Sequence, residues 1–217
     1  MTVSSSWYRA GVSSSPAPAS PPRRADALRN EELIRRAAIE AFHGRGLDTP
    51  LEQIAAAAGV AKGTIYHRFG GRQGLVDAVI GELVGAEMDR IAEVAERTAD
   101  PWEALAGYIR DRRDLHYREP AAVDALLASR LDSAALRGLA ERASRTSDGL
   151  IRRARDAGVL RADFTTPDLY HADVGNGLAL RRLPLPTPAD YERRTRIFLD
   201  GLRPPGHHPT GSGLPSS

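Results

Sequence analysis

The sequence of 217 residues predicts an all-α protein with two helical domains. Apolar residues recur at the three- and four-residue spacing of amphipathic helices through most of the chain, with proline or glycine between one such segment and the next. No alternating pattern of useful length predicts a strand, and no repeat of fixed period occurs. The apolar fraction of 41 % suits a globular protein with a core of its own.

Composition excludes several classes of function. The chain has no cysteine, which rules out disulfides, a thiol nucleophile and a cysteine-ligated metal. The formal net charge is only +2, so binding to nucleic acid would require a local cluster of charge. No apolar run is long enough to predict a membrane span, and residues 1–24 lack the apolar segment of a signal peptide. We therefore expect a cytoplasmic protein with no membrane association, no metal and no cofactor.

Both ends of the sequence are expected to be disordered tails. Residues 1–24 are rich in Ser, Pro and Ala, and residues 203–217 are rich in Pro, Gly and Ser. The second tail contains His207-His208 but not the further ligands that a metal site needs. Between the tails we expect one domain at residues 25–72 and a larger one at residues 73–202.

The first helix is predicted from about Asp26, and Gly44 and Gly46 end it. Its apolar residues follow the helical period: Leu28, Leu33, Ile34, Ala37, Ala38, Ala41 and Phe42.

The second helix has a clear start signal in Thr49-Pro50-Leu51-Glu52. This order predicts a Thr N-cap, a Pro at the first helical position and a Glu that completes a capping box. Apolar residues then recur at Leu51, Ile54, Ala55 and Ala58, and Gly59 suits the left-handed residue that ends a helix.

Further helices follow to the end of the second domain. A short third helix is expected from about Lys62 to Phe69, and Gly70-Gly71 ends it. A long fourth helix should reach Asp100-Pro101. Roughly five more are expected after it, with boundaries near Pro120, residues 131–134, Gly158, Pro167 and residues 184–188.

The second and third helices, joined by a three-residue turn with glycine, have the sequence form of a helix-turn-helix. Small Ala55 would let the helices cross closely, and Val60, Ile65 and Phe69 can anchor inward. Outward positions would then be Ala61, Lys62, Gly63, Tyr66 and His67, with Thr64 at the margin.

This outward face suits a DNA groove. Lys62 is the one lysine among 30 basic residues, and residues 59–72 hold three basic side chains and no acid. Lys62 and Thr64 can donate to base edges or phosphate, and the Tyr66 hydroxyl can donate to phosphate. His67, Arg68 and Arg72 could add phosphate contacts. The alternative is a helix-turn-helix that binds no DNA, in which Lys62 is an ordinary solvated lysine.

Residues 29–80 resemble the DNA-binding domain of the TetR family of bacterial transcriptional regulators. The resemblance is carried by IAAAAGVAKGTIYHRF and the following GGRQGLVDAV. It implies a phosphate contact at Thr49, approach of Lys62, Gly63 and Thr64 to bases or backbone, and phosphate binding by Tyr66 and His67. Arg72 stands where the family usually has Lys.

Three positions depart from the family pattern. Ala61 replaces the usual Ser or Thr cap, which removes about 0.5–2 kcal/mol of helix capping and a candidate phosphate contact. His67-Arg68 inverts the more usual order, which leaves open which of the two faces the DNA backbone. Gly71 removes a polar cap before the fourth helix.

The second domain contains no nucleophile elbow, HExxH, Walker loop or GxGxxG motif, so we expect no enzyme activity. The resemblance implies that this domain binds a small effector and forms a homodimer. Helical residues that could surround an effector are Trp102, Tyr108, Arg112, His116, Leu127, Arg130, Tyr170, His171 and Asn176. For each of them taken singly, core packing or exposure is an alternative role.

The last two helices are candidates for the dimer interface, as a four-helix arrangement with a second copy. The residues expected there are Leu169, Val174, Leu178, Tyr191, Phe198 and Leu202, with Gly175 and Gly177 allowing close approach. The same residues could instead close the core of the monomer.

Together these observations predict a dimeric DNA-binding regulator, a repressor released from a palindromic operator by a small molecule. Two alternatives remain open at this point. One is a constitutive dimeric DNA-binding protein without an effector. The other is a helical ligand-binding protein or enzyme that keeps the helix-turn-helix as scaffold.

Overall fold

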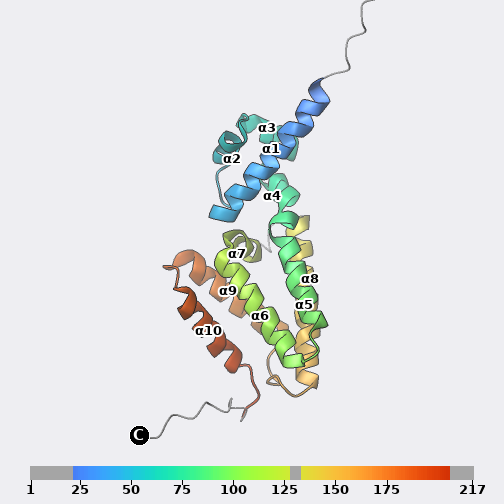
Figure 1. Ribbon diagram of the computed structural model, residues 1–217, viewed down its shortest axis with the longest axis vertical. Coiled ribbons are helices and arrows are strands. Elements are labelled where there is room, and N and C mark those ends of the chain that lie inside the picture. The colour runs from blue at the N-terminus through green and yellow to red at the C-terminus, as the bar shows by residue number, and fades with distance from the viewer. Residues whose placement is uncertain (1–21, 128–132, 206–217) are drawn as a thin grey trace, which may run out of the picture.

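The computed structural model describes residues 22–127 and 133–205, and these residues form an elongated, all-helical molecule (Figure 1). No strand occurs within the two described ranges, which confirms the predicted fold class. The predicted tails fall largely on residues 1–21 and 206–217, which lie outside the described residues. Helix α1 (Pro22–Arg45) begins at Pro22, so it includes the last three residues of the tail expected at residues 1–24.

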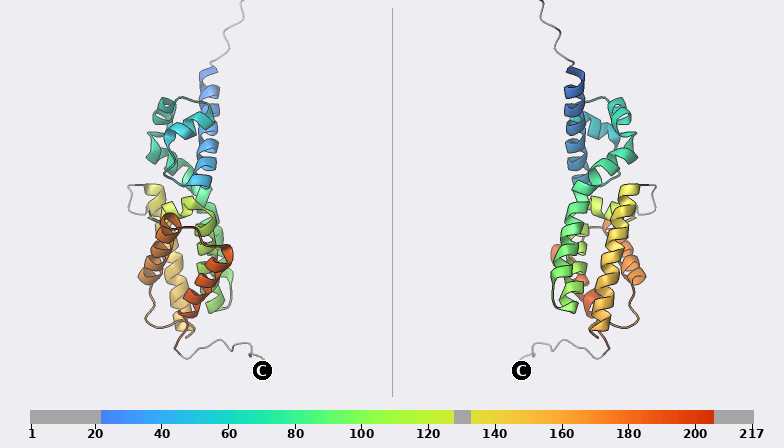
Figure 2. Two further views of the ribbon diagram at one scale, coloured as in Figure 1. Left: turned by 90° about the vertical axis from the view of Figure 1, so that its left-hand side faces the viewer. Right: turned by 90° about the vertical axis from the view of Figure 1, so that its right-hand side faces the viewer.

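Helices α1, α2 (Leu51–Ala58) and α3 (Lys62–Phe69) form one end of the molecule (Figures 1 and 2). The core that these helices share consists of apolar residues at the predicted helical spacing, and Ile34, Phe42, Ile54 and Ile65 are completely buried. Leu28 and Leu33, which also follow the helical period, lie on the solvent side of α1.

A single helical path connects this end to the rest of the molecule. It comprises α4 (Arg72–Ile80), a π-helical turn η1 (Gly81–Gly85) and α5 (Ala86–Arg97). The predicted long fourth helix is therefore confirmed, but the π turn at its centre was not predicted. A π turn inserts one residue into the helical ladder, and this one lies where the path leaves α1 and joins the second domain.

The second domain is built around α6 (Pro101–Arg118), which contacts five other helices. Its neighbours are α5, α7 (Pro120–Leu127), α8 (Ala134–Asp156), α9 (Thr166–Arg182) and α10 (Pro188–Asp200). The five helices expected after Pro101 are thus present. One face of α6 remains exposed at Arg110 and Asp114, whereas its polar residues Arg112, Arg113 and His116 are buried in the interior.

Local sequence explains where the helices of this domain begin. Asp100 accepts a hydrogen bond from the Glu103 N–H at 2.8 Å, and Ser133 caps α8 in the same way at 3.0 Å. Thr165 and Asp168 form a capping box at the start of α9. Each such cap satisfies a backbone N–H that the helix itself leaves unpaired.

Among the helices of the described ranges, none combines the length and the apolar composition that crossing a membrane requires.

Candidate nucleic-acid interface and ligand cavity

The helix-turn-helix has the predicted geometry. Gly59 ends α2 in the left-handed conformation with φ of 67°, and the Val60 N–H donates back to the Ala55 carbonyl at 3.0 Å. This turn directs Ile65 into the core. The opposite face of α3 is exposed at Ala61, Lys62, Gly63, Tyr66, His67 and Arg68, with Thr64 at the margin.

Lys62 has an acidic neighbour that the sequence stretch did not reveal. Its ammonium nitrogen lies 2.5 Å from the Glu52 carboxylate on α2 and 5.6 Å from the centre of the Tyr66 ring. The hydrogen bond to Glu52 raises the pKa of Lys62, and the same bond lowers the pKa of Glu52. The expected patch without an acid is therefore partly neutralised in three dimensions.

Thr49 does not take the expected place at the surface. Its side chain is only 3 % exposed, and its hydroxyl donates to the Gly46 carbonyl at 2.9 Å. The helix begins after Pro50 without a side-chain cap, so the predicted Thr49 N-cap is wrong. A phosphate contact by this hydroxyl would require the loop to open.

The Arg72 side chain also forms a hydrogen bond within the protein. Its guanidinium donates to the Leu47 carbonyl at 2.6 Å and thereby ties the start of α4 to the loop after α1. The same loop is held from the second domain, because the Leu47 N–H donates to Asp124 of α7 at 2.7 Å. Arg181 of α9 pairs with Asp124 at 3.0 Å. We call Leu47, Arg72, Asp124 and Arg181 the interdomain latch.

Gly46 makes the latch possible. The backbone there has φ of 85°, and a Cβ at this position would overlap the Asp124 carboxylate. Only glycine therefore lets Asp124 approach the loop this closely. A second link between the domains is the ion pair of His43 on α1 with Glu119, at the start of α7.

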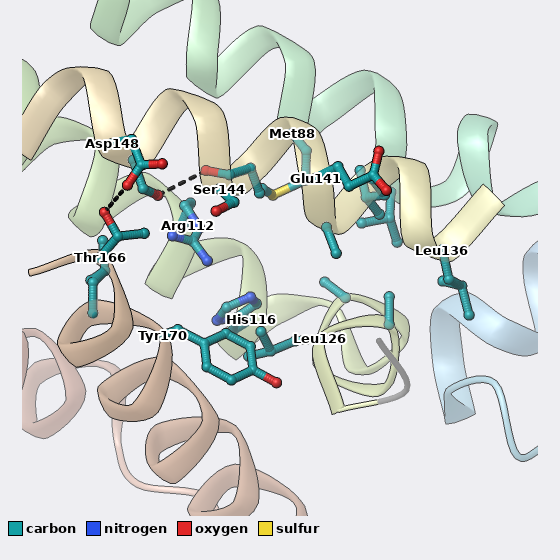
Figure 3. Close-up of a pocket in the computed structure, with 18 of the residues that line it drawn as sticks. Met88, Arg112, His116, Leu126, Leu136, Glu141, Ser144, Asp148, Thr166 and Tyr170 are labelled. Atoms are coloured by element: carbon teal, nitrogen blue, oxygen red, sulfur yellow. Dashed lines mark hydrogen bonds between the residues drawn. The ribbon is translucent and has the colours of Figure 1, made fainter. Parts of the chain in front are cut away.

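The second domain encloses a cavity of about 640 Å³, bordered by α5 to α9 (Figure 3). This volume is in the range of small-molecule sites, about 300–1,000 Å³. Most of the wall is apolar, with side chains such as Met88, Leu126, Leu136 and Leu139. In Figure 3 the polar residues Arg112, His116, Ser144, Asp148 and Thr166 lie toward one side and Leu136 toward the other.

Three buried charged residues, Arg112, Arg113 and Asp173, lie at or next to the polar side of the cavity. Arg112 pairs with Asp173 of α9 at 2.9 Å, and the Arg113 Nε lies 3.8 Å from the other Asp173 oxygen. Arg113 also stacks over the Phe198 ring, with its guanidinium carbon 4.0 Å from the ring centre. Two cations thus share one carboxylate, which leaves a net positive charge beside the cavity.

His116 is uncharged in this setting. Burial lowers its pKa from 6.5 to about 4, and the charges of Arg112 and Arg113 add to the lowering while Asp173 opposes it. Its Nδ1 is buried and has no hydrogen-bond partner among the described residues. The neutral ring can therefore donate or accept a bond from inside the cavity.

We expect His116→Gln to weaken the decrease of the free energy of unfolding below neutral pH. The unfolded chain takes up a proton near pH 6.5 and the folded protein only near 4, so acidification through this window destabilises the fold. The full loss is about 3 kcal/mol for wild type and should be absent in the variant. Urea unfolding from about pH 7 to about pH 4.5 measures the difference.

Two other acids, Glu119 and Asp124, serve as a common background in this comparison. Burial raises the pKa of Glu119 and of Asp124, so their contribution to stability has the opposite dependence on pH. Both are unchanged in the variant, and the comparison of the two proteins isolates His116. Parallel profiles for the two proteins would contradict a buried neutral ring.

Three of the predicted effector residues, Arg112, His116 and Tyr170, line the cavity, and the other predicted residues within the described ranges do not. The guanidinium carbon of Arg203 lies 3.7 Å from the centre of the Trp102 ring. The Tyr108 hydroxyl donates a hydrogen bond to the Ala143 carbonyl at 3.2 Å. Leu127 is the last residue of α7, His171 is hydrogen-bonded to the Pro167 carbonyl, and Asn176 donates a hydrogen bond to the Tyr191 hydroxyl. Arg130 lies outside the described residues.

The predicted dimer residues divide between core and surface. Leu169, Tyr191 and Leu202 are buried in the monomer, and Val174 and Phe198 are half-buried. Only Leu178 of the predicted set is exposed. Gly177 permits a close approach to Val123 of α7 within the same chain, whereas Gly175 faces open space. For the buried residues the alternative, closing the monomer core, is the one observed.

Sequence reasoning missed Asp173, Asp124 and most of the apolar cavity wall. A signal for Asp173 existed, because Leu169, Asp173 and Gly177 are spaced by four and share the buried face of α9. An acid on such a face needs a buried partner. No comparable signal marks Asp124, whose partners lie 77 and 57 residues away.

Comparison with known proteins agrees with this geometry. Residues 34–79 match the family described as bacterial regulatory proteins, tetR family, and residues 100–204 match the SbtR-like C-terminal domain of transcriptional regulators. The repressor KstR2 of Mycolicibacterium smegmatis is 32 % identical over 82 residues, which are 37 % of this chain and 40 % of that protein. The chain thus aligns with less than half of this curated relative.

Two solved structures extend the likeness over nearly their whole length. The TetR transcriptional regulator SCO0520 from Streptomyces coelicolor is 30 % identical with a TM-score of 0.51, covering 80 % of this chain and 98 % of that one. AibR, solved in complex with isovaleryl coenzyme A and operator DNA, has a TM-score of 0.58 at 16 % identity, covering 81 % and 98 %. From the helix-turn-helix, the helical second domain and these matches, the chain belongs to the TetR family of bacterial transcriptional regulators.

Proposed function

We propose that this protein is a dimeric transcriptional repressor that leaves a palindromic operator when a small molecule occupies the cavity. The observation that carries the proposal is the exposed face of α3, where the one lysine of the sequence, a tyrosine, a histidine and an arginine project from a well-anchored helix-turn-helix. Such a helix fits the major groove, where it reads base edges while its flanks bind phosphate.

The residues proposed for DNA contact lie at the start and on the outer face of α3, and all are exposed except Thr64, which is half-buried. They are Ala61, Lys62, Gly63, Thr64, Tyr66, His67 and Arg68. Arg72 and Thr49 are better assigned to holding the loop between α1 and α2, because their polar groups already have partners there.

The cavity supports an effector, and it counts against a constitutive DNA-binding protein without one. Among relatives, KstR2 is named a repressor, and AibR was solved with both an acyl coenzyme A and operator DNA. By analogy we assign the 640 Å³ cavity to the effector, with Arg112, His116 and Tyr170 at its polar side.

Helix α7 couples the cavity to the DNA-binding end. Ala122, Ala125 and Leu126 of α7 form part of the wall, and Asp124 between them holds the interdomain latch. A ligand that repositions α7 would move Asp124 and with it the loop before α2. Ligand and operator would then favour different states of the latch, which is a population shift with reciprocal effects on both affinities.

The last two helices offer a surface for a second copy. Exposed apolar side chains gather along α9, the following loop and α10, namely Leu178, Leu183, Leu185 and Ile197. We propose this surface for the homodimer. A helix-turn-helix dimer on a palindrome holds its two recognition helices about one DNA turn apart, ~34–36 Å, and a dimer through this surface has to meet that spacing.

Selection of bound fragments from genomic DNA of the source organism tests the proposal. Salt must be held near the physiological value, because phosphate contacts alone give salt-dependent binding without sequence preference. Enrichment of one palindromic site is the expected result. Uniform recovery of fragments from protein stripped of ligand by refolding would contradict a specific regulator and favour a helix-turn-helix kept as scaffold.

Lys62→Ala and Tyr66→Phe should each weaken binding to the selected site by roughly tenfold or more, without changing the unfolding transition. Glu52→Gln should act in the opposite direction, since it frees the Lys62 ammonium for DNA. Titration of a labelled operator measures all three. Lys62→Ala should also lower the salt slope by about one if the contact is to phosphate.

Arg152→Ala is the control, because Arg152 is an exposed arginine on α8 in the other domain. It should bind the operator as wild type does. If both Lys62→Ala and Tyr66→Phe bind the operator with wild-type affinity, the placement of α3 in the major groove is wrong.

A further inference from the structure

The cavity also indicates the chemical class of its ligand, through the balance of charge in its wall. Arg112, Arg113 and Asp173 are each at least nine-tenths buried. Asp173 makes a close pair with Arg112, at 2.9 Å, and a loose one with Arg113, at 3.8 Å. Buried cations are normally matched by acids, and this cluster holds two cations and one carboxylate.

The net positive charge of this cluster of two arginines and one carboxylate borders the cavity through Arg112. Arg112 belongs to the wall, whereas Arg113 does not and is covered by Phe198. The Nε of Arg112 and the Nδ1 of His116 are both buried without a hydrogen-bond partner among the described residues. Since unpaired buried polar groups are rare in folded proteins, these two atoms indicate a polar group that is supplied from the cavity.

The other acids of the wall limit the ligand to one negative charge. Asp148 accepts a hydrogen bond from Thr166, and Glu141 is exposed, so neither reaches the buried cations. Both carboxylates would repel a second negative group at the entrance. Apart from Arg112, His116, these acids and the hydroxyl groups of Ser144, Ser147, Thr166 and Tyr170, the wall is mostly apolar, with side chains such as Leu126, Leu136 and Leu139.

From this arrangement we infer that the cavity binds a monoanionic amphiphile, a molecule with an apolar body and one carboxylate-type head that pairs with Arg112 and hydrogen-bonds His116. The apolar body then occupies the space toward Leu136. The regulatory meaning of this ligand rests on the proposed function, but the binding itself does not.

Calorimetry with three probes of equal chain length tests the inference on the full chain without DNA. Decanoate should bind about tenfold or more tightly than decanol, because it adds a charge-assisted bond to a buried guanidinium. Decylammonium should bind most weakly. Equal affinity for decanoate and decanol, or no binding of either, would overturn the inference, and this comparison needs no variant.

Arg112→Met locates the preference in the cavity. The variant keeps one arginine for one carboxylate, which leaves this cluster neutral, and its affinities for decanoate and decanol should lie within about twofold of each other. Arg110→Met is the matched control, since Arg110 is exposed on the same helix and pairs with Glu103 at 3.1 Å. An undiminished preference in Arg112→Met would place the anion elsewhere and overturn the assignment.

A second readout separates this inference from the proposed function. On the selected operator fragment, decanoate should release the protein and decanol should not. Preference for decanoate without release would contradict the regulatory role while the ligand class stands. Equal release by both probes would support the regulatory role and overturn the ligand class.

Discussion

Replacing Asp173 with asparagine should lower the free energy of unfolding by about 3–5 kcal/mol. The substitution preserves size but leaves Arg112 and Arg113 as two uncompensated cations in the interior, where each is only 6 % exposed. Breaking a buried ion pair is costly because the remaining charge has neither water nor a counter-ion. Urea unfolding at neutral pH, extrapolated to zero denaturant, gives the value.

Two variants sharpen this measurement. Asp114→Asn removes an exposed acid on α6 that pairs with Arg118 at 2.7 Å, and it should cost at most about 1 kcal/mol. Adding Arg112→Met to Asp173→Asn should recover part of the lost stability by removing one of the two cations. If Asp173→Asn costs no more than Asp114→Asn, the buried charges must be hydrated.

Gly74→Ala should disable the DNA-binding end of the molecule. A Cβ at Gly74 would overlap the carbonyl oxygen of Phe69, the last residue of α3, and lie 2.8 Å from its carbonyl carbon. Neither is a flexible side chain, so α3 and α4 must separate. We expect a loss of about 1–3 kcal/mol or more in stability, together with loss of operator binding, because α3 would no longer be fixed relative to α1.

The matched control is Gly149→Ala on α8, where a Cβ meets nothing within 4 Å. Alanine suits a helix better than glycine, so this variant should be neutral or gain up to about 1 kcal/mol. Unfolding curves and operator titration should be recorded for both variants. Operator affinity equal to wild type in Gly74→Ala would contradict a rigid junction between α3 and α4.

The helix-turn-helix could be predicted from sequence because its determinants are local. Gly59, Ile65 and the spacing of alanines in α2 act within about ten residues of one another, and their roles follow from backbone geometry and helical period alone. The same reasoning failed at Lys62, whose acidic partner lies on another helix. It also did not reveal that Thr49 and Arg72, which the family pattern assigns to DNA, have backbone partners in the loop after α1.

The cavity was beyond prediction for a related reason. Its wall takes side chains from α5 to α9, and periodicity shows which face of a helix is apolar but not whether that face meets another helix or an open space. Arg112 and His116 could be named from sequence as polar residues on a helix that could border a cavity. Asp173 was not named, because its importance arises only when α9 lies against α6.

The position of Lys62 has a practical consequence for any assay that couples the protein to a surface. Its side chain is the single ε-amino group of this sequence, and it stands exposed on the face of α3 proposed for DNA. Amine-reactive resins, dyes and cross-linkers that modify this ε-amino group would therefore attach at that face and block it. Protein immobilised through Lys62 would lose its operator for a reason unrelated to its fold, whereas the extent of Lys62 modification, compared with and without DNA, would report whether the complex covers this face.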